Sequence, residues 1–166
     1  MGEINMSKWD DKVLFSSKAH DWETPAPLFN AINDEFAFTL DAAASPGNAK
    51  CARYFTEKDD ALSRSWQHNR VWVNPPYGRG IKVWMEKCAR EGLESLVVAL
   101  VFARTDTRWF HDWVVPYALE VRFIKGRVSF VRGDETGPAP APSMLVIWAP
   151  CTKYKKPNAV EAMIQP

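Results

Sequence analysis

One stretch decides the expected fold, and it reads Arg70-Val71-Trp72-Val73-Asn74-Pro75-Pro76-Tyr77. Its apolar run predicts a buried strand, which ends at a polar residue and two prolines that cannot continue a ladder. Each proline also keeps the residue before it out of the α region, so Asn74 and Pro75 are expected to be extended. The stretch therefore predicts a stiff loop at the carboxyl end of a strand, where open α/β sheets bind their ligands.

The residues of this loop suit methylation of a planar amine whose lone pair is delocalised into a ring. The side-chain oxygen of Asn74 and the carbonyl of Pro75 can accept the two N–H bonds of such an amine. Tyr77 can stack on the face of the base, and loss of its hydroxyl alone is expected to have a mild effect. The alternative is an ordinary strand-to-helix turn, because Asn-Pro and Pro-Pro are common loop dipeptides. The strand before the loop and the aromatic residue after it favour a functional interpretation.

Length and composition indicate a single globular domain. The chain has 166 residues, of which 46% are hydrophobic and 25% charged. No apolar run approaches the roughly 18 residues that span a bilayer, and the first residues lack a secretory signal pattern. Cys51, Cys88 and Cys151 are widely spaced and odd in number, which indicates neither a metal site nor a disulfide framework. We therefore expect a cytoplasmic protein, without a metal or a membrane partner.

Charge is distributed unevenly along the chain, although the net charge is only +1. Residues 1–66 carry 7 basic against 11 acidic side chains, whereas residues 67–166 carry 14 against 9. A basic half that contains the candidate loop is compatible with a polyanionic substrate, although many soluble proteins are equally uneven.

The first half of the chain predicts an arm, a helix and a strand. Residues 1–20 show no periodicity and are expected to form an arm. Thr24 followed by Pro25 predicts a helix start that runs to about Glu35. The helical spacing rests on Leu28, Phe29, Ile32 and Phe36. Residues 36–41 then predict a strand.

Two acidic loops follow in this half. Asp41 ends the predicted strand, and the small residues Ala42 to Ser45 after it would let a ligand approach the backbone. A carboxylate there can pair with the ammonium of a methionine moiety or accept from ribose hydroxyls, or it can simply form a turn. Asp60 can bind the amino group of a cofactor adenine, whereas a solvated acidic turn is the preferred interpretation of Asp59.

The second half alternates helices and strands. A helix is expected from the Gly78–Gly80 bend to Gly92, followed by a central parallel strand at 96–102 that is buried on both faces. Residues 105–107 predict the cap of another helix. The next strand runs over 121–131 with a bend at Gly126, and 133–142 predicts a mobile loop. The last strand, 143–148, follows without an intervening helix, so it is expected to be antiparallel.

The order of these pieces resembles the phage and prophage DNA adenine-N6-methyltransferases, a Dam-like family, over roughly Phe15 to Trp148. The resemblance rests on seven segments: Asp21-Trp22-Glu23-Thr24-Pro25, Leu40-Asp41-Ala42-Ala43-Ala44-Ser45, Asn48-Ala49-Lys50-Cys51, Asp59-Asp60-Ala61-Leu62, Val73-Asn74-Pro75-Pro76-Tyr77, Gly126-Arg127 and Ser143-Met144-Leu145. It implies S-adenosyl-L-methionine as donor, adenine in double-stranded DNA as acceptor, and a Rossmann-like class I methyltransferase fold. In that α/β fold a mostly parallel, doubly wound sheet has an antiparallel last strand.

The resemblance also implies roles for individual residues. The catalytic set would be Asn74, Pro75, Pro76 and Tyr77, and Tyr77 would also contact the target base. The cofactor would contact Thr24, Pro25, Asp41, Ala42, Ala43 and Asp60. Phosphates would meet Arg79, Arg104 and Arg127, with Arg108 and Lys125 as further candidates, although surface solvation explains each of these cations equally well.

The sequence departs from the family pattern in two respects. Ala-Ala-Ala-Ser replaces the glycine-rich cofactor loop, and no room remains for a separate target-recognition domain. The hypothesis is thus one methyltransferase domain over 1–166, with the 1–20 arm and the 151–166 tail peripheral and a monomer compatible with the sequence. One alternative is the same fold acting on RNA adenine, cytosine N4 or protein glutamine. Another is a non-catalytic nucleic-acid-binding module.

Overall fold

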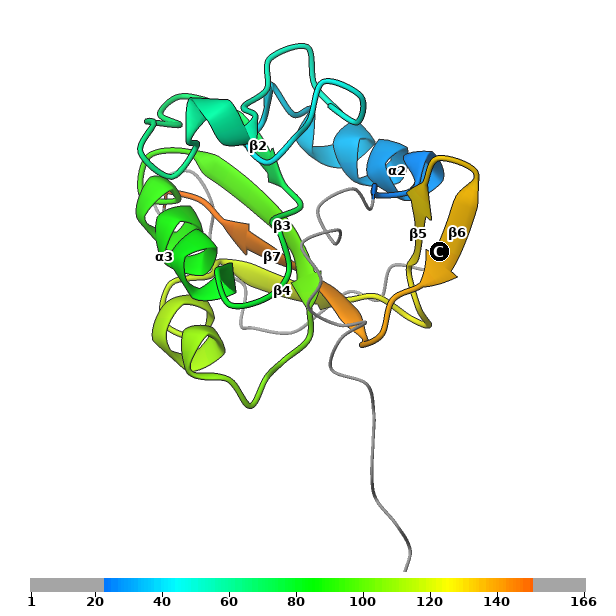
Figure 1. Cartoon of the computed structure of the whole chain (residues 1–166). Helices are drawn as coiled ribbons and strands as arrows, with labels where there is room; N and C mark the ends of the chain where they lie inside the picture. Colours follow the sequence, from blue (N-terminus) through cyan, green and yellow to red (C-terminus); the bar gives the residue numbers. More distant parts are fainter. Residues whose placement is uncertain (1–22, 151–166) are drawn as a thin grey trace, which may run out of the picture.

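The computed structural model describes residues 23–150, so the predicted arm at 1–20 and tail at 151–166 lie outside the described residues. A five-stranded sheet forms the centre, in the order β1-β2-β3-β7-β4 (Figure 1). Its strands are β1 (Leu40–Asp41), β2 (Arg70–Val73), β3 (Leu96–Phe102), β4 (Glu120–Phe123) and β7 (Ser143–Trp148). β7 is antiparallel to both of its neighbours and the other four strands share one direction. The predicted mixed α/β fold, with a mostly parallel sheet and an antiparallel last strand, is therefore confirmed.

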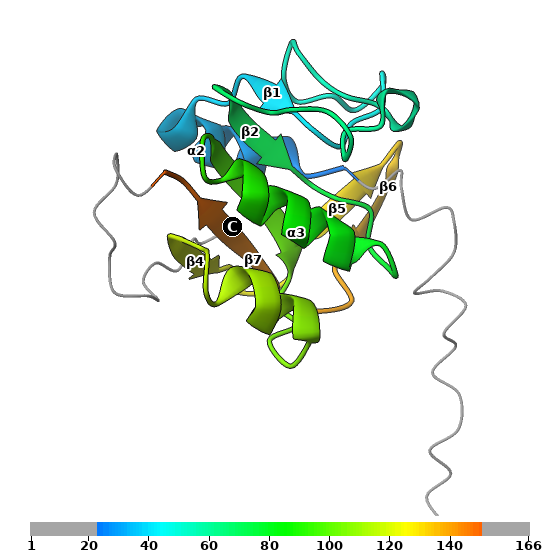
Figure 2. The same ribbon diagram turned by 90° about the vertical axis from the view of Figure 1, so that its left-hand side faces the viewer.

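Both faces of the sheet are covered (Figure 2). Helix α2 (Ala26–Phe36) and the hairpin of β5 (Ser129–Arg132) and β6 (Glu135–Pro138) share one hydrophobic cluster with the sheet. Helix α3 (Ile81–Glu91) and the short η3 (Phe110–Val114) share the other. Alternate residues of β3 enter the two clusters, which explains why its sequence is apolar without interruption. No helix in the described part of the chain is long and apolar enough to cross a bilayer.

The parallel pairing of β1 with β2 brings two predicted site segments to the same edge of the sheet. Asp41 is in register with Trp72, and the backbone N–H of Ala42 donates to the Trp72 carbonyl at 3.0 Å. The chain leaves β2 at Val73, so the loop that begins at Asn74 lies beside the segment after Asp41. As predicted, α3 follows this loop and has Gly92 as its C-cap.

The start of α2 differs from the prediction. Its N-cap is Pro25, whose ψ of 136° is extended and whose carbonyl accepts the N–H of Phe29 at 3.0 Å. Thr24 is therefore not the cap residue. It is turned inward and buried, with an exposed fraction of 2%.

The strand predicted at 36–41 is shorter than expected. α2 continues through Phe36 and closes with Ala37 in a left-handed conformation, at φ 50°. Phe38 then packs against Phe29 and Trp72, with ring centroids 5.9 and 5.4 Å away. Only Leu40 and Asp41 pair with β2 as a strand, because α2 and its left-handed cap take up Phe36 and Ala37, although the Thr39 N–H still donates to the Arg70 carbonyl at 2.8 Å.

Two predictions in the second half are also corrected. A helix does follow residues 105–107, but it is short: residues 108–109 are α-helical and run into the five-residue π-helix η3, and the Thr107 hydroxyl donates backward to the Arg104 carbonyl at 2.7 Å. The strand expected to continue through Gly126 leaves the central sheet there, at a φ of 79°, and β5 pairs with β6 instead. The loop expected at 133–142 therefore contains a strand, because Gly133, at φ 57°, permits a tight turn into β6.

Candidate active site

Two cavities meet at the carboxyl edge of β1 and β2. A cleft of about 560 Å³ is lined by the segments 42–46, 56–58 and 60–62, the loop 74–77 and Trp84. A second, narrow cavity of about 20 Å³, room for about one water, is lined by residues that include Thr24, Asp41 and Lys50. Ala43 and Asn74 line both cavities. The volume of the cleft falls within the usual range of small-molecule sites.

The structure brings most of the predicted site residues to these cavities. The cleft contains Ala42, Ala43, Asp60, Asn74, Pro75, Pro76 and Tyr77. Thr24 and Asp41 line the narrow cavity, whereas Pro25 lines neither of the two.

Asp41 is a buried carboxylate that organises the loop after β1. Its exposed fraction is 3%, and its oxygens accept the backbone N–H groups of Ala43 at 3.2 Å and Lys50 at 3.0 Å. Burial raises the pKa of Asp41, and the two hydrogen bonds oppose that rise. The turn-forming role considered for this residue is thus observed, and direct contact with a cofactor stays a prediction.

The sequence-based prediction missed two charged residues of the narrow cavity. Lys50 Nζ lies 3.4 Å from Glu23 Oε2, and both side chains line this cavity. The hydroxyl oxygen of Thr24 beside them is buried and has no hydrogen-bond partner. The cavity therefore offers a positive group, a negative group and an unused hydroxyl. Lys50 lies in one of the segments that carry the resemblance, but its contact with a residue 27 positions earlier leaves no local pattern.

The loop after β2 is held by the residues around Tyr77. The Tyr77 hydroxyl lies 3.0 Å from Asn74 Oδ1 and 3.2 Å from the Leu100 carbonyl oxygen. The Tyr77 ring stacks on Phe102 with a centroid distance of 4.1 Å and an interplanar angle of 13°. Burial raises the pKa of Tyr77, so the phenol stays protonated. Because Phe102 covers one face of the ring, a base could stack on Tyr77 only from the opposite face.

The second acidic loop divides its two carboxylates as expected. Asp59 ends the short turn η2 (Glu57–Asp59), and its carboxylate accepts both the backbone N–H and the hydroxyl of Thr56, at 2.8 and 2.7 Å. These hydrogen bonds lower the pKa of Asp59. Asp60 is exposed and lines the cleft, whereas Asp59 does not line it.

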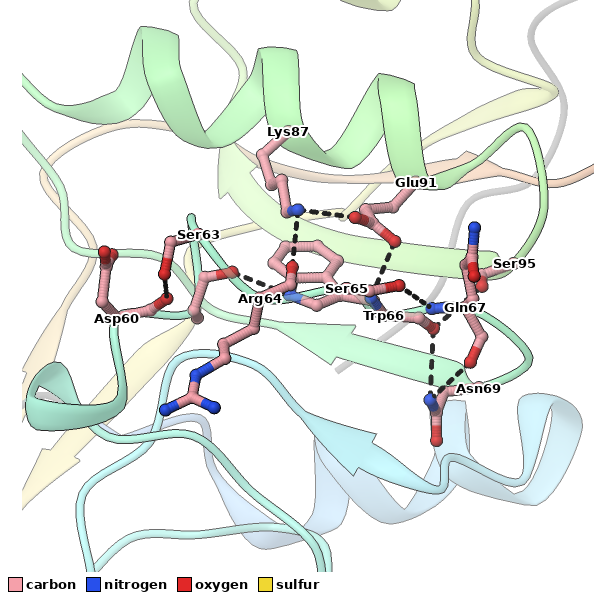
Figure 3. A network of polar contacts seen from close by, with 11 residues as sticks. Asp60, Ser63, Arg64, Ser65, Trp66, Gln67, Asn69, Lys87, Glu91 and Ser95 are labelled. Atoms are coloured by element: carbon pink, nitrogen blue, oxygen red, sulfur yellow. Dashed lines mark hydrogen bonds and ion pairs between the residues drawn. The ribbon is translucent and has the colours of Figure 1, made fainter.

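A polar network anchors the loop that carries Asp60 (Figure 3). The Ser63 hydroxyl donates to the Asp60 carbonyl at 2.9 Å, and Lys87 Nζ on α3 donates to the Arg64 carbonyl at 2.6 Å. Glu91, also on α3, accepts the backbone N–H of Trp66 at 2.8 Å. One wall of the cleft is therefore fixed to α3.

Comparison with known proteins places the chain in a family. The family described as DNA N-6-adenine-methyltransferase (Dam) matches residues 13–163. The chain belongs to this family. A DNA N-6-adenine-methyltransferase of Haemophilus phage HP1 is 31% identical over 140 residues, which cover 80% of each chain. A DNA N-6-adenine-methyltransferase of Escherichia phage T1 is 31% identical over 137 residues, covering 71% of this chain and 56% of its own.

These matches confirm the predicted family, and with it an enzyme that methylates adenine N6 in DNA. Among the described residues of this Dam-family chain, no group of three or more His, Cys, Asp and Glu side chains is placed to hold a metal ion.

The basic side chains of residues 23–150 separate into two groups. Those with a hydrogen bond, ion pair or ring contact include Lys50, Lys87, Arg90 and Arg122. The cations without such a partner are Lys58, Arg79, Lys82, Arg104, Arg108, Lys125 and Arg127. All of them lie in segments that follow the carboxyl ends of β1 to β4, the edge that carries both cavities. The predicted phosphate contacts Arg79, Arg104 and Arg127 belong to this second group.

Proposed function

We propose that the protein transfers the methyl group of S-adenosyl-L-methionine to N6 of adenine in double-stranded DNA, at the loop Asn74–Tyr77. The observation that carries the proposal is that Asn74 lines both cavities. A donor that lies in the cleft, with its charged amino-acid end at the mouth of the narrow cavity, would therefore pass the side chain that holds the acceptor amine. The sheet would be a reduced form of the Rossmann-like class I methyltransferase fold.

The residues around the narrow cavity fit the amino-acid end of the donor. A methionine moiety is zwitterionic, and Glu23 and Lys50 supply one charge of each sign. Thr24 supplies a buried hydroxyl that otherwise lacks a partner. Such an orphaned polar group costs stability unless a ligand or water satisfies it. We assign the α-carboxylate to Lys50 and the α-ammonium to Glu23 and Asp41.

The cleft fits the adenosine end. Ala42 and Ala43 form one wall from small side chains, and exposed Asp60 on the opposite wall can accept from the adenine amino group. When bound, S-adenosyl-L-methionine supplies an electrophilic methyl group on sulfur.

The chain's own residues would then prepare the acceptor amine. Asn74 Oδ1 and the Pro75 carbonyl accept the two N6 hydrogens, which directs the nitrogen lone pair at the methyl group. The open face of the Tyr77 ring stacks on the extruded adenine. Transfer would proceed without a covalent enzyme intermediate: the N6–CH3 bond forms as the S–CH3 bond breaks, S-adenosylhomocysteine leaves, and the surplus N6 proton passes to water. Positioning and electrostatic orientation supply most of the acceleration.

Duplex DNA would approach the edge that carries the unpartnered cations. Phosphate contacts dominate the affinity of proteins for DNA and require basic side chains that are free to bind them. Arg79, Arg104 and Arg127 meet this condition, whereas Arg90 on α3 pairs with Glu86. Neutralising a phosphate-binding cation should therefore weaken binding to all DNA sequences alike.

The test is transfer of a labelled methyl group to unmethylated duplex DNA, followed by nucleoside analysis. Labelled N6-methyladenine is the expected product, and Asn74→Ala should abolish it while S-adenosylhomocysteine still binds in calorimetry. Label in RNA, in cytosine or in protein would instead reassign the acceptor. Cofactor binding by the unaltered protein without any product would identify a non-catalytic module.

A further inference from the structure

The hydroxyl of Tyr77 joins three parts of the site. It contacts the side chain of Asn74, which follows β2, and the backbone carbonyl of Leu100, which lies in β3. A phenol has one proton, so this donor is shared between two oxygen acceptors, at 3.0 and 3.2 Å. The Asn74 side chain is thereby linked to the middle strand of the sheet through the Tyr77 hydroxyl.

Phe102 fixes the ring that carries this hydroxyl. It lies two residues after Leu100 on β3, so both residues belong to the same face of the strand. Its ring stacks on Tyr77, and Phe130 from the hairpin meets Tyr77 edge-on with a centroid distance of 6.1 Å. Two rings and one carbonyl therefore restrict the orientation of Tyr77, and the largely buried strand β3 provides two of these three contacts.

The proposed mechanism requires Asn74 Oδ1 to point at the N6 amino group of the target adenine and accept one of its hydrogens. An amide oxygen has two lone pairs, so it can accept from Tyr77 with one and from an adenine N6 hydrogen with the other. Loss of the first contact removes one restraint on the Asn74 side chain and makes it easier for the NH2 group, which cannot accept a hydrogen bond, to take the place of the oxygen. The Tyr77 hydroxyl favours the orientation in which the oxygen remains available.

We propose that Tyr77, through its hydroxyl, and Phe102, through its ring, are positioning residues for Asn74. This proposal rests on the proposed function and extends it to two groups that do not react. Tyr77 then has two separable roles, because the open face of the ring receives the base and the hydroxyl orients the asparagine. Phe102 has only the second role, because its ring lies behind Tyr77.

The sequence alone predicts a mild effect of Tyr77→Phe, and the structure revises that expectation. The phenylalanine ring keeps its stack on Phe102 and its open face, so the KM for DNA and the affinity for S-adenosylhomocysteine should stay near their original values. kcat should fall by about tenfold, as expected when a hydrogen bond that orients a reacting group is lost. Phe102→Leu should lower kcat in the same way, and Phe102→Tyr should restore most of it.

Single-turnover and steady-state methyl transfer on unmethylated duplex DNA measure these effects. The double variant Tyr77→Phe with Phe102→Leu should be little slower than the slower single variant, because both changes act through Asn74. Phe36→Leu is the matched control. It disrupts a stacked pair with Phe38, whose centroids lie 5.8 Å apart, at the far end of α2, and should leave kcat unchanged.

The proposal is wrong if Tyr77→Phe keeps the original kcat, or if it lowers only the affinity for DNA or for the cofactor product. The proposal would also be contradicted if the effects of Tyr77→Phe and Phe102→Leu on kcat were fully additive in the double variant. If Tyr77→Phe does not fold, the contrast between Phe102→Leu and Phe102→Tyr still decides the outcome. A parent protein that forms no N6-methyladenine would refute the proposed function. An active parent with an unaffected Tyr77→Phe variant refutes only the positioning roles.

Discussion

The backbone N–H of Trp66 donates to the Glu91 carboxylate at 2.8 Å, and this contact ties the loop before β2 to the last residue of α3. Trp66 is fully buried, and its ring also lies 5.3 Å from Lys87 Nζ. The loop on the other side of Trp66 carries Asp60. The wall of the cleft therefore depends on a residue of α3 that lines neither cavity.

Glu91→Ala should lower the free energy of unfolding by about 1–3 kcal/mol, because it leaves the buried Trp66 N–H without an acceptor. Urea denaturation measures this loss. Glu86→Ala is the control, since Glu86 forms an exposed i,i+4 pair with Arg90 on the same helix. It should cost about 0.5 kcal/mol or less. Equal losses for the two variants would show that the contact to Trp66 contributes nothing.

Glu35→Gln should make the protein less stable at neutral pH but not in acid. Arg122 binds both oxygens of Glu35, at 2.6 and 2.7 Å, and these hydrogen bonds lower the pKa of Glu35 from its ordinary 4.5. A carboxyl group whose pKa is lower in the folded than in the unfolded protein stabilises the fold at pH values above its unfolded pKa. This stabilisation is lost as the pH falls through the pKa of the folded protein.

The expected difference between the parent and Glu35→Gln at pH 7 is about 0.5–1 kcal/mol, because the Glu35 side chain is half exposed. Urea titrations at several pH values from 7 down to 3 should show this difference shrinking below about pH 4.5. Asp34→Asn changes the adjacent carboxylate on α2, and its free energy of unfolding should show no such pH-dependent difference from the parent. A difference that stays constant over the whole range would rule out the ion pair as its origin.

Gly92→Ala should destabilise the protein although the backbone of Gly92 is helical, at φ −61° and ψ −14°. A Cβ there would collide with the Cβ of Trp148, a residue with an exposed fraction of 1%. Overpacking of this kind costs about 1–3 kcal/mol. Gly80→Ala is the control, because its φ of −78° is also helical and nothing lies within 4 Å of the added atom. Thermal unfolding should show a lower Tm for Gly92→Ala and an unchanged or slightly higher Tm for Gly80→Ala.

Arg127→Gln should weaken DNA binding and reduce its salt dependence. Removal of one phosphate contact lowers the slope of log K against log salt concentration by about one. Fluorescence anisotropy on a labelled duplex at several salt concentrations measures the slope. Arg90→Gln removes the same charge from a cation that already pairs with Glu86 and lies 5.7 Å from the Trp113 ring, so the slope should not change. Equal slopes for both variants would exclude Arg127 from the DNA surface.

The sequence predicted the elements whose signals are local. β2, β3 and α3 follow from continuous apolar runs, two prolines and a terminal glycine, and each of these acts on its own neighbours. The shortened β1 depends on the continuation of α2 through Phe36 and on its left-handed cap at Ala37, which the apolar pattern of residues 36–41 does not reveal. The hairpin was missed because β6 is rich in exposed and turn-forming residues, and only its pairing with β5 makes it a strand.

The same distinction applies to the site. Asn74 and Asp60 were found because a motif or a cluster of acidic residues marks each of them. The contact of Lys50 with Glu23 and that of the Tyr77 hydroxyl with Leu100 join residues 27 and 23 positions apart. Such contacts exist only once the chain has folded, so no periodicity or spacing could predict them.

Glu23 contacts both the β5–β6 hairpin and the narrow cavity. Its backbone pairs with Val131 of the hairpin through hydrogen bonds of 2.7 and 3.0 Å, and its side chain pairs with Lys50 in the narrow cavity. A ligand that separates Lys50 from Glu23 therefore acts on a residue that also holds the hairpin. By thermodynamic linkage, the factor by which such a ligand changes the affinity of any partner bound at the hairpin equals the factor by which that partner changes the affinity of the ligand. An increase in the affinity of one ligand caused by the other is therefore always matched by an equal increase in the opposite direction.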